Sequence, residues 1–281
     1  MEIPFREWHA AIPIRTSRRR YIPQELEPET MAHMRRVCRE FRPFPQARAE
    51  LLTQNVKSIL SGLRGSYGLI KGAAALIAFI GDTSDPHVQE KAGYTGEGII
   101  LEATARGLDT CWVAGTFRRK ATSSLLGIAS NERVIAVTPV GHAPEDHSFG
   151  ERILPTIIRA RKRKPLSELA NGMDESEWPR WMQAALEAAR LAPSAYNRQP
   201  WRFRLEPDSI TVSAVDLNYD FGFSLRLDCG IAMMHIEVAA LDCGARGKWE
   251  HCSILPMWPG SLSPAAFRTN VSHIQISLPL A

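Results

Sequence analysis

The sequence is short of cysteine and has no long apolar run. Its five cysteines include no C-x-x-C pair and show no regular spacing, which argues against a disulfide framework and a zinc site. The longest apolar stretch, residues 72–81, falls short of the roughly 20 residues that a bilayer-spanning helix needs. The N-terminal MEIPFREWHAA lacks the sustained apolar core of a secretory signal. These absences predict a cytoplasmic protein with reduced thiols, no metal centre and no membrane contact.

Motifs of several nucleotide-binding and catalytic folds are also missing. The chain contains no G-x-G-x-x-G, G-x-x-x-x-G-K-[ST], G-x-S-x-G or H-E-x-x-H sequence. A dedicated dinucleotide-binding fold is therefore not indicated. The eight histidines are scattered, and we expect His235, inside an apolar helical segment, to be a hydrogen-bonded core residue rather than a ligand.

The composition is that of an ordinary globular protein. The 281 residues are 44% hydrophobic and 23% charged, which excludes disorder, coiled coil and collagen and allows one large core or two modest ones. The net charge is only +4, but basic residues cluster at 18–20 and 159–164. Such clusters need an anionic partner or open solvent. A nucleic-acid surface is disfavoured because no interleaved aromatics or helix-turn-helix motif accompanies them.

Two similar series of elements are predicted along the chain. The first comprises an amphipathic helix at 27–41, a buried strand at 73–80, a buried helix at 96–107, and core strands at 111–114 and 134–141. The second comprises a helix from about Trp178 capped by Asp174 and Glu177, a hairpin at 201–215, an apolar helix at 229–244 and a half-buried strand at 273–278.

The two series end their buried helices in the same way. Gly107 is followed five residues later by Trp112, and Gly244 is followed five residues later by Trp249. On this spacing alone, an internal repeat and a coincidence are equally favoured. With Pro165 as the boundary, the halves are residues 1–165 and 166–281.

The loop APSAYNRQPW at 192–201 is the most specific stretch. Pro193 ends the preceding helix, while Ser194, Asn197 and Gln199 crowd hydrogen-bond donors and acceptors into a few residues. Such a loop suits the edge of a flat heteroaromatic ring with alternating carbonyl and N–H groups. The alternative is a polar turn followed by an ordinary core tryptophan.

A second candidate constellation is IRTSRRRY at 14–21. In an extended segment, Arg15, Ser17 and Arg19 point to one side and place two cations around a hydroxyl. Arginine suits phosphate because its planar fork binds two oxygens at once. The alternative is a solvated basic strand.

These segments resemble motifs of the nitroreductase flavoproteins. The loop at 192–201 is similar to the family's APSxxNxQPW sequence, and 14–21 is similar to its N-terminal RxSxR motif. The basic run at 159–164 resembles the basic pair that completes the family's phosphate site, and GLDTCWVAGTF at 107–117 resembles the segment that faces the flavin N5 and O4 atoms. The resemblance implies FMN as cofactor.

The resemblance also implies a role for each residue. Arg15 and Ser17 would hold the FMN phosphate, and Arg19 would stabilise negative charge on the reduced ring. The remaining FMN contacts would be Arg161 and Arg163 at the phosphate, Ala114, Gly115 and Thr116 near N5, and Pro193, Ser194, Asn197 and Gln199 at the ring edge.

Each characteristic motif occurs in only one half. RxSxR lies in the first half and the APSxxNxQPW loop in the second, whereas each site of the family's homodimers takes these motifs from different subunits. The chain therefore resembles the fused single-chain subgroup of the family. The resemblance implies an α+β fold with a central mixed sheet flanked by helices, two pseudo-repeated halves that mimic the homodimer, one complete site, and a possible monomer.

The implied activity is FMN-dependent reduction of small electron-poor acceptors, such as nitroaromatics and quinones. NADH or NADPH would act as transient donor in ping-pong hydride transfer, and no side chain would serve as a nucleophile. The alternative is a flavin-binding protein without turnover, used for storage or sensing. Residues 41–67 have no evident counterpart in the family.

Overall fold

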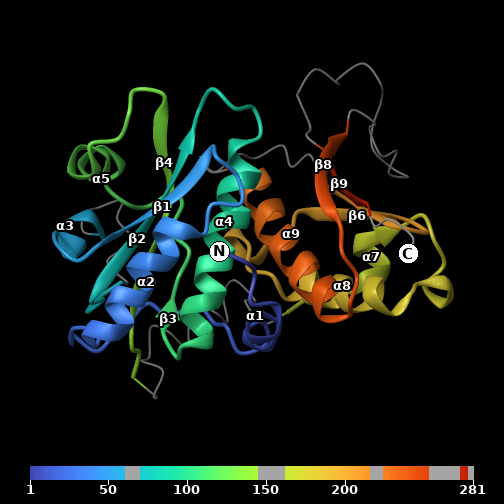
Figure 1. Ribbon diagram of the computed structural model, residues 1–281, viewed down its shortest axis with the longest axis horizontal. Coiled ribbons are helices and arrows are strands. Elements are labelled where there is room, and N and C mark those ends of the chain that lie inside the picture. The colour runs from blue at the N-terminus through green and yellow to red at the C-terminus, as the bar shows by residue number, and fades with distance from the viewer. Residues whose placement is uncertain (61–69, 145–161, 216–223, 253–272, 278–281) are drawn as a thin grey trace.

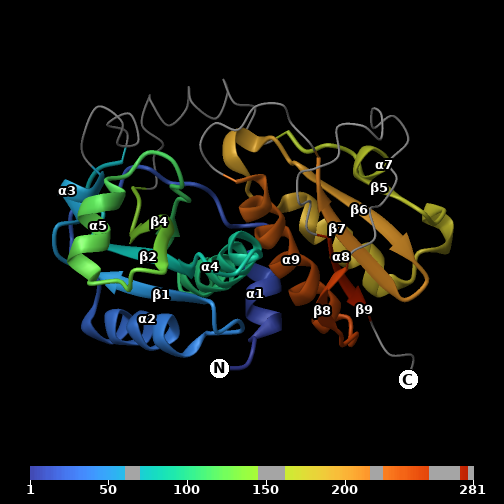
Figure 2. The same ribbon diagram turned by 90° about the horizontal axis from the view of Figure 1, so that it is seen from above.

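Two β-sheets with long helices between them make up the fold (Figures 1 and 2). The computed structural model describes residues 1–60, 70–144, 162–215, 224–252 and 273–277. The α+β class, with sheets flanked by helices, is confirmed. The described strands form two separate sheets instead of one central sheet, and no helix in these ranges is long and apolar enough to cross a membrane.

The first sheet contains the strands of the N-terminal part in the order β1-β2-β4-β3, and all of its pairs are antiparallel. Its strands are β1 (Ala47–Leu52), β2 (Ala75–Asp82), β3 (Asp109–Thr110) and β4 (Glu132–Gly141). The helices around it are α1 (Phe5–Ala11), α2 (Pro28–Glu40), α3 (Val56–Leu60), α4 (Val88–Ala105) and α5 (Arg119–Leu126).

Both faces of β2 are buried, as its unbroken apolar run predicts. Ile77 and Phe79 belong to the large core shared with α2 and α4, whereas Leu76, Ala78 and Ile80 pack in a smaller cluster with α3. Because successive side chains of a strand point to opposite faces, one run of apolar residues supplies two cores.

The second sheet has the order β5-β6-β7-β9-β8 and is mixed, because β5 pairs with β6 in parallel while the other pairs are antiparallel. Its strands are β5 (Ala170–Asn171), β6 (Trp201–Glu206), β7 (Ser209–Ala214), β8 (Lys248–Cys252) and β9 (His273–Ser277). Its helical elements are α7 (Leu166–Leu169), η2 (Glu175–Glu177), α8 (Arg180–Leu191), η3 (Ala195–Asn197) and α9 (Leu225–Asp242).

The helices α4 and α9 touch through their backbones. Each has 18 residues, and Gly93 and Gly230 are the sixth residue of their respective helices. A Cβ on Gly93 would lie 2.2 Å from the carbonyl oxygen of Leu227, and a Cβ on Gly230 would lie 2.1 Å from that of Glu90. The contact is reciprocal, as in an interface with two-fold symmetry.

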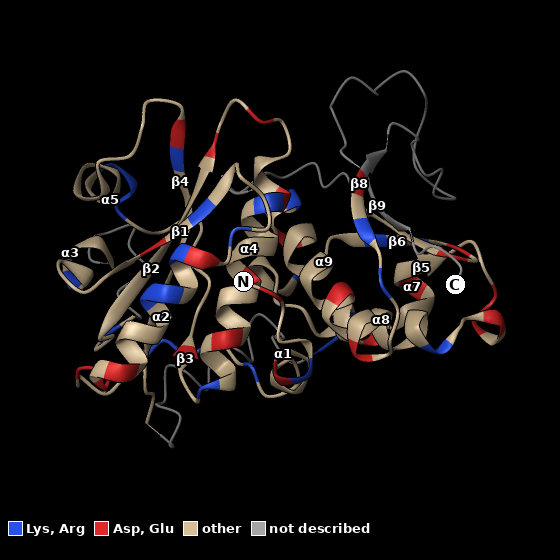
Figure 3. Ribbon diagram, viewed as in Figure 1, with Lys and Arg blue, Asp and Glu red and all other residues tan. Residues whose placement is uncertain are grey.

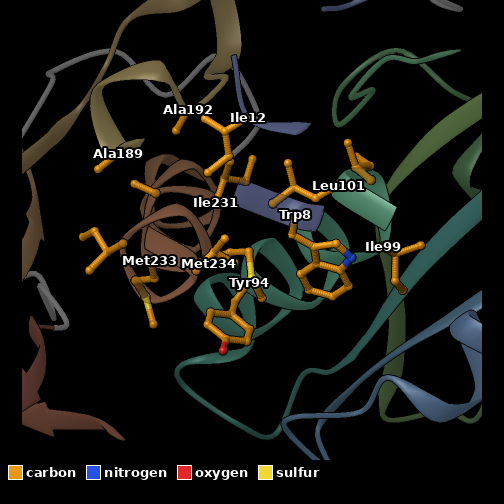
Figure 4. Close-up of a cluster of buried hydrophobic side chains, with 14 of the residues drawn as sticks. Trp8, Ile12, Tyr94, Ile99, Leu101, Ala189, Ala192, Ile231, Met233 and Met234 are labelled. Atoms are coloured by element: carbon orange, nitrogen blue, oxygen red, sulfur yellow. The ribbon is translucent and has the colours of Figure 1, made fainter. Parts of the chain in front are cut away.

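Apolar side chains from three helices pack around this crossing (Figure 4). Trp8 of α1, Tyr94 of α4, and Ile231 and Met234 of α9 are all at most 3% exposed. The central core therefore belongs to neither sheet alone.

Both central helices also end in the same way. Gly107 and Gly244 have φ angles of 73° and 83°, the left-handed conformation that glycine adopts without steric cost. Beyond them the N–H of Leu108 donates to the Ala103 carbonyl, and the N–H of Ala245 donates to the Ala240 carbonyl, each at 2.9 Å. The predicted glycine stops are confirmed.

Three predicted elements differ in the structure. Residues 111–114 form no strand, because only Val113 pairs with β4, through an isolated bridge to Val137. The helix predicted at 96–107 begins earlier, at Val88. The prediction started too late because the first turns carry polar residues, several of which are nevertheless buried. Asp174 caps the short η2 instead of α8, because Trp178 precedes Pro179 and is held extended, so that α8 begins at Arg180.

The crossing predicts a large cost for a single methyl group. In an open helix, replacing glycine by alanine stabilises the fold by about 0.5–1 kcal/mol, but Gly93→Ala and Gly230→Ala should lower the free energy of unfolding by about 2 kcal/mol or more, because the backbones must separate. Gly107→Ala is the comparison, since it meets nothing within 4 Å and carries only the strain of its positive φ. Urea denaturation measures all three, and a stabilised Gly93→Ala would contradict the close crossing.

Candidate functional site

The basic segment at 14–21 runs along the end of the first sheet. Ser17 pairs with Thr110 of β3 and Arg20 pairs with Lys71, each through an isolated parallel bridge. Arg18 is buried, and its guanidinium donates to the Pro144 carbonyl. The segment therefore does not alternate as simply as an extended strand would, and Arg18 was not among the predicted site residues.

Arg15 is a buried cation with unused hydrogen-bonding capacity. Its side chain is only 6% exposed, and among the residues that the structure describes neither its Nε nor its Nη1 atom has a hydrogen-bond partner. Oε1 of Glu97 lies 3.9 Å from its Nε atom. A buried guanidinium in this state is suited to an anionic ligand.

Glu97 joins the two central helices. Its Oε1 atom lies 2.9 Å from Nε2 of His235 on α9, and its Oε2 accepts a 2.7 Å hydrogen bond from the Trp112 indole. Gly96 leaves room for that indole, because a Cβ there would lie 2.4 Å from the ring. Glu97 and His235 both have fully buried side chains. Acidic residues of α4 and α9 thus lie in the layer between the sheets (Figure 3).

The loop at 192–201 follows α8 and is held in a strained conformation. Tyr196, Asn197 and Gln199 have φ angles of 52°, 54° and 51°, in the left-handed region that side chains rarely adopt. The Ser194 hydroxyl accepts from the Gln199 N–H at 2.9 Å and closes the turn. Strain of this kind persists where surrounding contacts fix the backbone, and it is common at binding sites.

The basic segment at 162–164 is hydrogen-bonded to this loop. Arg163 donates from Nη1 to Oδ1 of Asn197 at 3.1 Å, and the Asn197 amide donates to the Lys162 carbonyl at 2.8 Å. Gln199 accepts from the Lys164 N–H at 2.8 Å and donates to the Lys162 carbonyl at 3.1 Å. Burial, and after it the charges of Arg15 and Arg190, lowers the pKa of Arg163. Arg15 is therefore close enough to Arg163 for the two charges to interact.

The structure thus brings Arg15, Arg163, Ser194, Asn197 and Gln199 into one polar region, and Pro193 begins its loop. Arg163 and Asn197, expected at opposite ends of FMN, are in direct contact.

Other predicted positions are less directly connected to it. Ser17 and Arg19 are held through their backbones, the latter by a hydrogen bond from the Lys71 N–H to its carbonyl. The Ala114 carbonyl accepts from Arg119, and no contact joins Ala114, Gly115 or Thr116 to the loop among the described residues. Arg161 lies outside the described residues.

Most of the chain matches a known protein family. The model of the family described as "Putative TM nitroreductase" matches residues 7–240. The chain belongs to this family. The match includes the arginine segment at 14–21 and the loop at 192–201. It places the chain among nitroreductase-type oxidoreductases. No curated protein matches the sequence.

A solved nitroreductase has a similar structure over nearly the whole chain. A "putative nitroreductase" from Thermotoga maritima MSB8 has a TM-score of 0.61 and 18% identity, over 96% of this chain and 93% of that one. An FMN-dependent nitroreductase from Clostridium difficile R20291 has a TM-score of 0.42 and 20% identity, over 49% and 88% of the two chains. A nitroreductase with bound FMN from Bacteroides fragilis NCTC 9343 has a TM-score of 0.41 and 15% identity, over 51% and 91%. The first likeness supports the nitroreductase fold.

Three residues of this nitroreductase-family chain hold parts of the site together but were not among the predicted site residues. Glu97 and Asp228 lie outside the motifs that were compared, whereas Trp112 lies inside the segment 107–117 and was noted there only for its spacing from Gly107. A usable signal was present, because Glu97 and Asp228 are charged residues in otherwise apolar helical segments, and a buried charge requires partners. The expectation for His235 is confirmed, since both ring nitrogens have hydrogen-bond partners.

Asp228 supports the loop from α9. Its carboxylate accepts from the Ala195 N–H, with both oxygens at 3.3 Å, and the residue is 4% exposed. Burial raises the pKa of this carboxyl to about 7, although the Ala195 N–H and the charge of Arg198 oppose the shift. The ionised form is therefore the costly one in the folded state.

This carboxyl predicts an unusual pH dependence. Between about pH 4 and 7 the folded chain keeps a proton on Asp228 that the unfolded chain has released, so its contribution to stability falls as pH rises through this window. Asp228→Asn should reduce that fall and be at least as stable as the parent at pH 8. Urea midpoints at pH 5 and 8 measure the effect. The pKa of the Asp82 carboxyl is lowered, so Asp82→Asn should leave the change in stability between pH 5 and 8 as it is in the parent. A change of the parent's size in Asp228→Asn would refute the raised pKa of Asp228.

Proposed function

We propose that this nitroreductase-family chain is an FMN-dependent NAD(P)H oxidoreductase that reduces small electron-poor acceptors such as nitroaromatics and quinones. The buried Arg15 guanidinium is the observation that carries the proposal, because its Nε and Nη1 atoms lack hydrogen-bond partners within the described ranges and its charge is close enough to Arg163 to lower the pKa of that residue. A phosphate monoester would supply the missing acceptors and compensate two neighbouring cations. The residues present therefore fit the phosphate end of FMN.

The loop at 192–201 fits the other end of the cofactor. Its Asn197 and Gln199 amides offer both donors and acceptors, which the pyrimidine edge of a flavin requires. In the present structure Arg163 donates a hydrogen bond to the side-chain oxygen of Asn197. That oxygen must be released before it can accept from a flavin, so we expect FMN binding to separate these two side chains. Ser17, Arg19, Arg161 and the segment from Ala114 to Thr116 remain the proposed further contacts.

FMN, when bound, supplies the hydride chemistry by which NADH or NADPH reduces the acceptor. The chain's own residues bind the phosphate, hold the strained loop and exclude solvent from the buried charges. Among the described residues, no three His, Cys, Asp or Glu side chains gather as metal ligands. The cavity lined by 171–173 and 204–207 contains none of the site residues.

We further propose that the halves, 1–165 and 166–281, mimic a homodimer within one cytoplasmic chain that needs no second copy. The reciprocal contacts of Gly93 and Gly230 support this proposal. The central helices are nevertheless unequal. The tenth residue is Glu97 in α4 and Met234 in α9, and the eleventh is Gly98 in α4 and His235 in α9. This asymmetry supports a single site.

Titration of the FMN-free chain tests the composite site. Arg15→Ala and Asn197→Ala, which alter different halves, should each weaken FMN binding by roughly tenfold or more, because each removes hydrogen bonds to a charged or buried group. Quenching of flavin fluorescence measures the affinity. Arg39→Ala is the matched control, since that side chain is 75% exposed and, in the part of the chain that the structure describes, pairs only with its neighbour Glu40. Parent-like affinity in both site variants would sink the proposal.

Stoichiometry and reduction test the rest of the proposal. We expect one FMN per chain in a monomer, with rapid bleaching by NADH or NADPH without oxygen and recovery of the yellow colour with a quinone. Flavin absorbance divided by chain concentration gives the stoichiometry, light scattering gives the oligomeric state, and the change in absorbance gives the reduction and recovery. Two FMN per chain would contradict the single site, and flavin that binds but never bleaches would indicate a storage or sensing protein instead.

A further inference from the structure

The hydrogen bonds of His235 require a shared proton between the two central helices. Its Nδ1 lies 2.8 Å from the Ala188 carbonyl oxygen, which can only accept, so Nδ1 carries a hydrogen. Its Nε2 lies 2.9 Å from Oε1 of Glu97, and two lone pairs at that distance would repel. One proton must therefore lie between Nε2 and Oε1. The other carboxylate oxygen accepts from Trp112, which can only donate.

This pair lies beside the buried arginine. Oε1 of Glu97 is 3.9 Å from Nε of Arg15, and the three side chains are at most 6% exposed. A proton held on His235 leaves the Glu97 carboxylate negative on the side of Arg15, so the negative end of this buried pair faces the guanidinium. On the other side of the helix crossing, Met234 and Gly98 occupy the corresponding helix positions, and the Trp8 and Phe41 rings pack on Gly98.

We propose that Glu97 and His235 are positioning residues for Arg15, which hold its guanidinium at the junction of the halves with Nε and Nη1 presented to a phosphate monoester. The inference rests on the anion-binding role proposed for Arg15. The interhelical pair of Glu97 and His235, which lies outside the basic motifs, determines whether Arg15 can bind an anion. The pair exists on one side of the crossing only, which gives the inequality of the halves a physical basis.

Simple electrostatics and positioning predict opposite results for Glu97→Gln. If Glu97 acted only through its charge, its removal would favour an anionic ligand and tighten FMN binding. If it holds Arg15 in place, its removal leaves a buried guanidinium without a counter-charge, which must turn away or draw in water. Positioning therefore predicts weaker binding.

The experiment compares two chemically matched glutamates of α4 in the FMN-free full chain. Glu102 accepts from the Trp8 indole, and it binds His33 and Arg106, but it has no contact with Arg15. We expect Glu97→Gln to weaken FMN binding by roughly tenfold or more and Glu102→Gln to leave it within about twofold, with both variants less stable. Parent-like or tighter binding by Glu97→Gln would overturn the proposal.

A double-mutant cycle shows whether Glu97 acts through Arg15. Adding Glu97→Gln to Arg15→Ala should cost no further affinity, whereas a general structural role would cost the same in both backgrounds and overturn the proposal. If Arg15→Ala itself binds FMN normally, the proposed phosphate site fails as well. If only Glu97→Gln binds normally, the site stands and the positioning role alone is refuted.

A measurement on the unaltered chain covers the case in which Glu97→Gln does not fold. Proton NMR of the FMN-free chain should show hydrogens on both ring nitrogens of His235, protected from exchange. Addition of inorganic phosphate should shift the Nε2 resonance of His235 but leave that of His33 unchanged. A single ring hydrogen on His235, or no shift while phosphate binds, would overturn the proposal.

Discussion

The backbone contact between α4 and α9 constrains the rest of the molecule. Gly93 and Gly230 allow each helix to lie against a carbonyl oxygen of the other, closer than any side chain would permit. About one turn further along, the same proximity lets Glu97 of α4 reach His235 of α9 directly. Helices at ordinary packing distance would place side chains between them. The position of the buried Glu97–His235 pair, and of Arg15 beside it, therefore depends on the absence of a Cβ atom at Gly93 and Gly230.

The candidate site forms where sequence-distant segments meet at this junction. Arg15 comes from the chain after α1, Arg163 from the segment before α7, and Asn197 from the strained loop after α8. Neither sheet contains the site. Charge couples the parts, because burial and the neighbouring Arg15 together lower the pKa of Arg163. An anionic ligand would relieve both effects, which is the physical basis of the proposed phosphate site.

Local patterns predicted most of the fold, whereas interactions between segments had to be observed. The strand at β2, the hairpin of β6 and β7, and the glycine stops at Gly107 and Gly244 follow from apolar runs and turn residues. The start of α8 was misplaced because Pro179 overrides a good capping pattern. Motif resemblance selected Arg15 and Asn197, but it could not reveal Glu97, whose role depends on a partner far away in sequence. Nor could it predict the direct contact of Arg163 with Asn197, which joins two separate motifs.

If two unequal halves share one phosphate-binding site built around Arg15, a crystal structure of the chain with FMN will show it. We expect one FMN per chain, with its phosphate within hydrogen-bond distance of Nε or Nη1 of Arg15, its ring edge against the loop at 192–201, and Arg163 separated from Asn197. A phosphate bound away from Arg15, or a second FMN related to the first across the α4–α9 crossing, would rule out a single shared site.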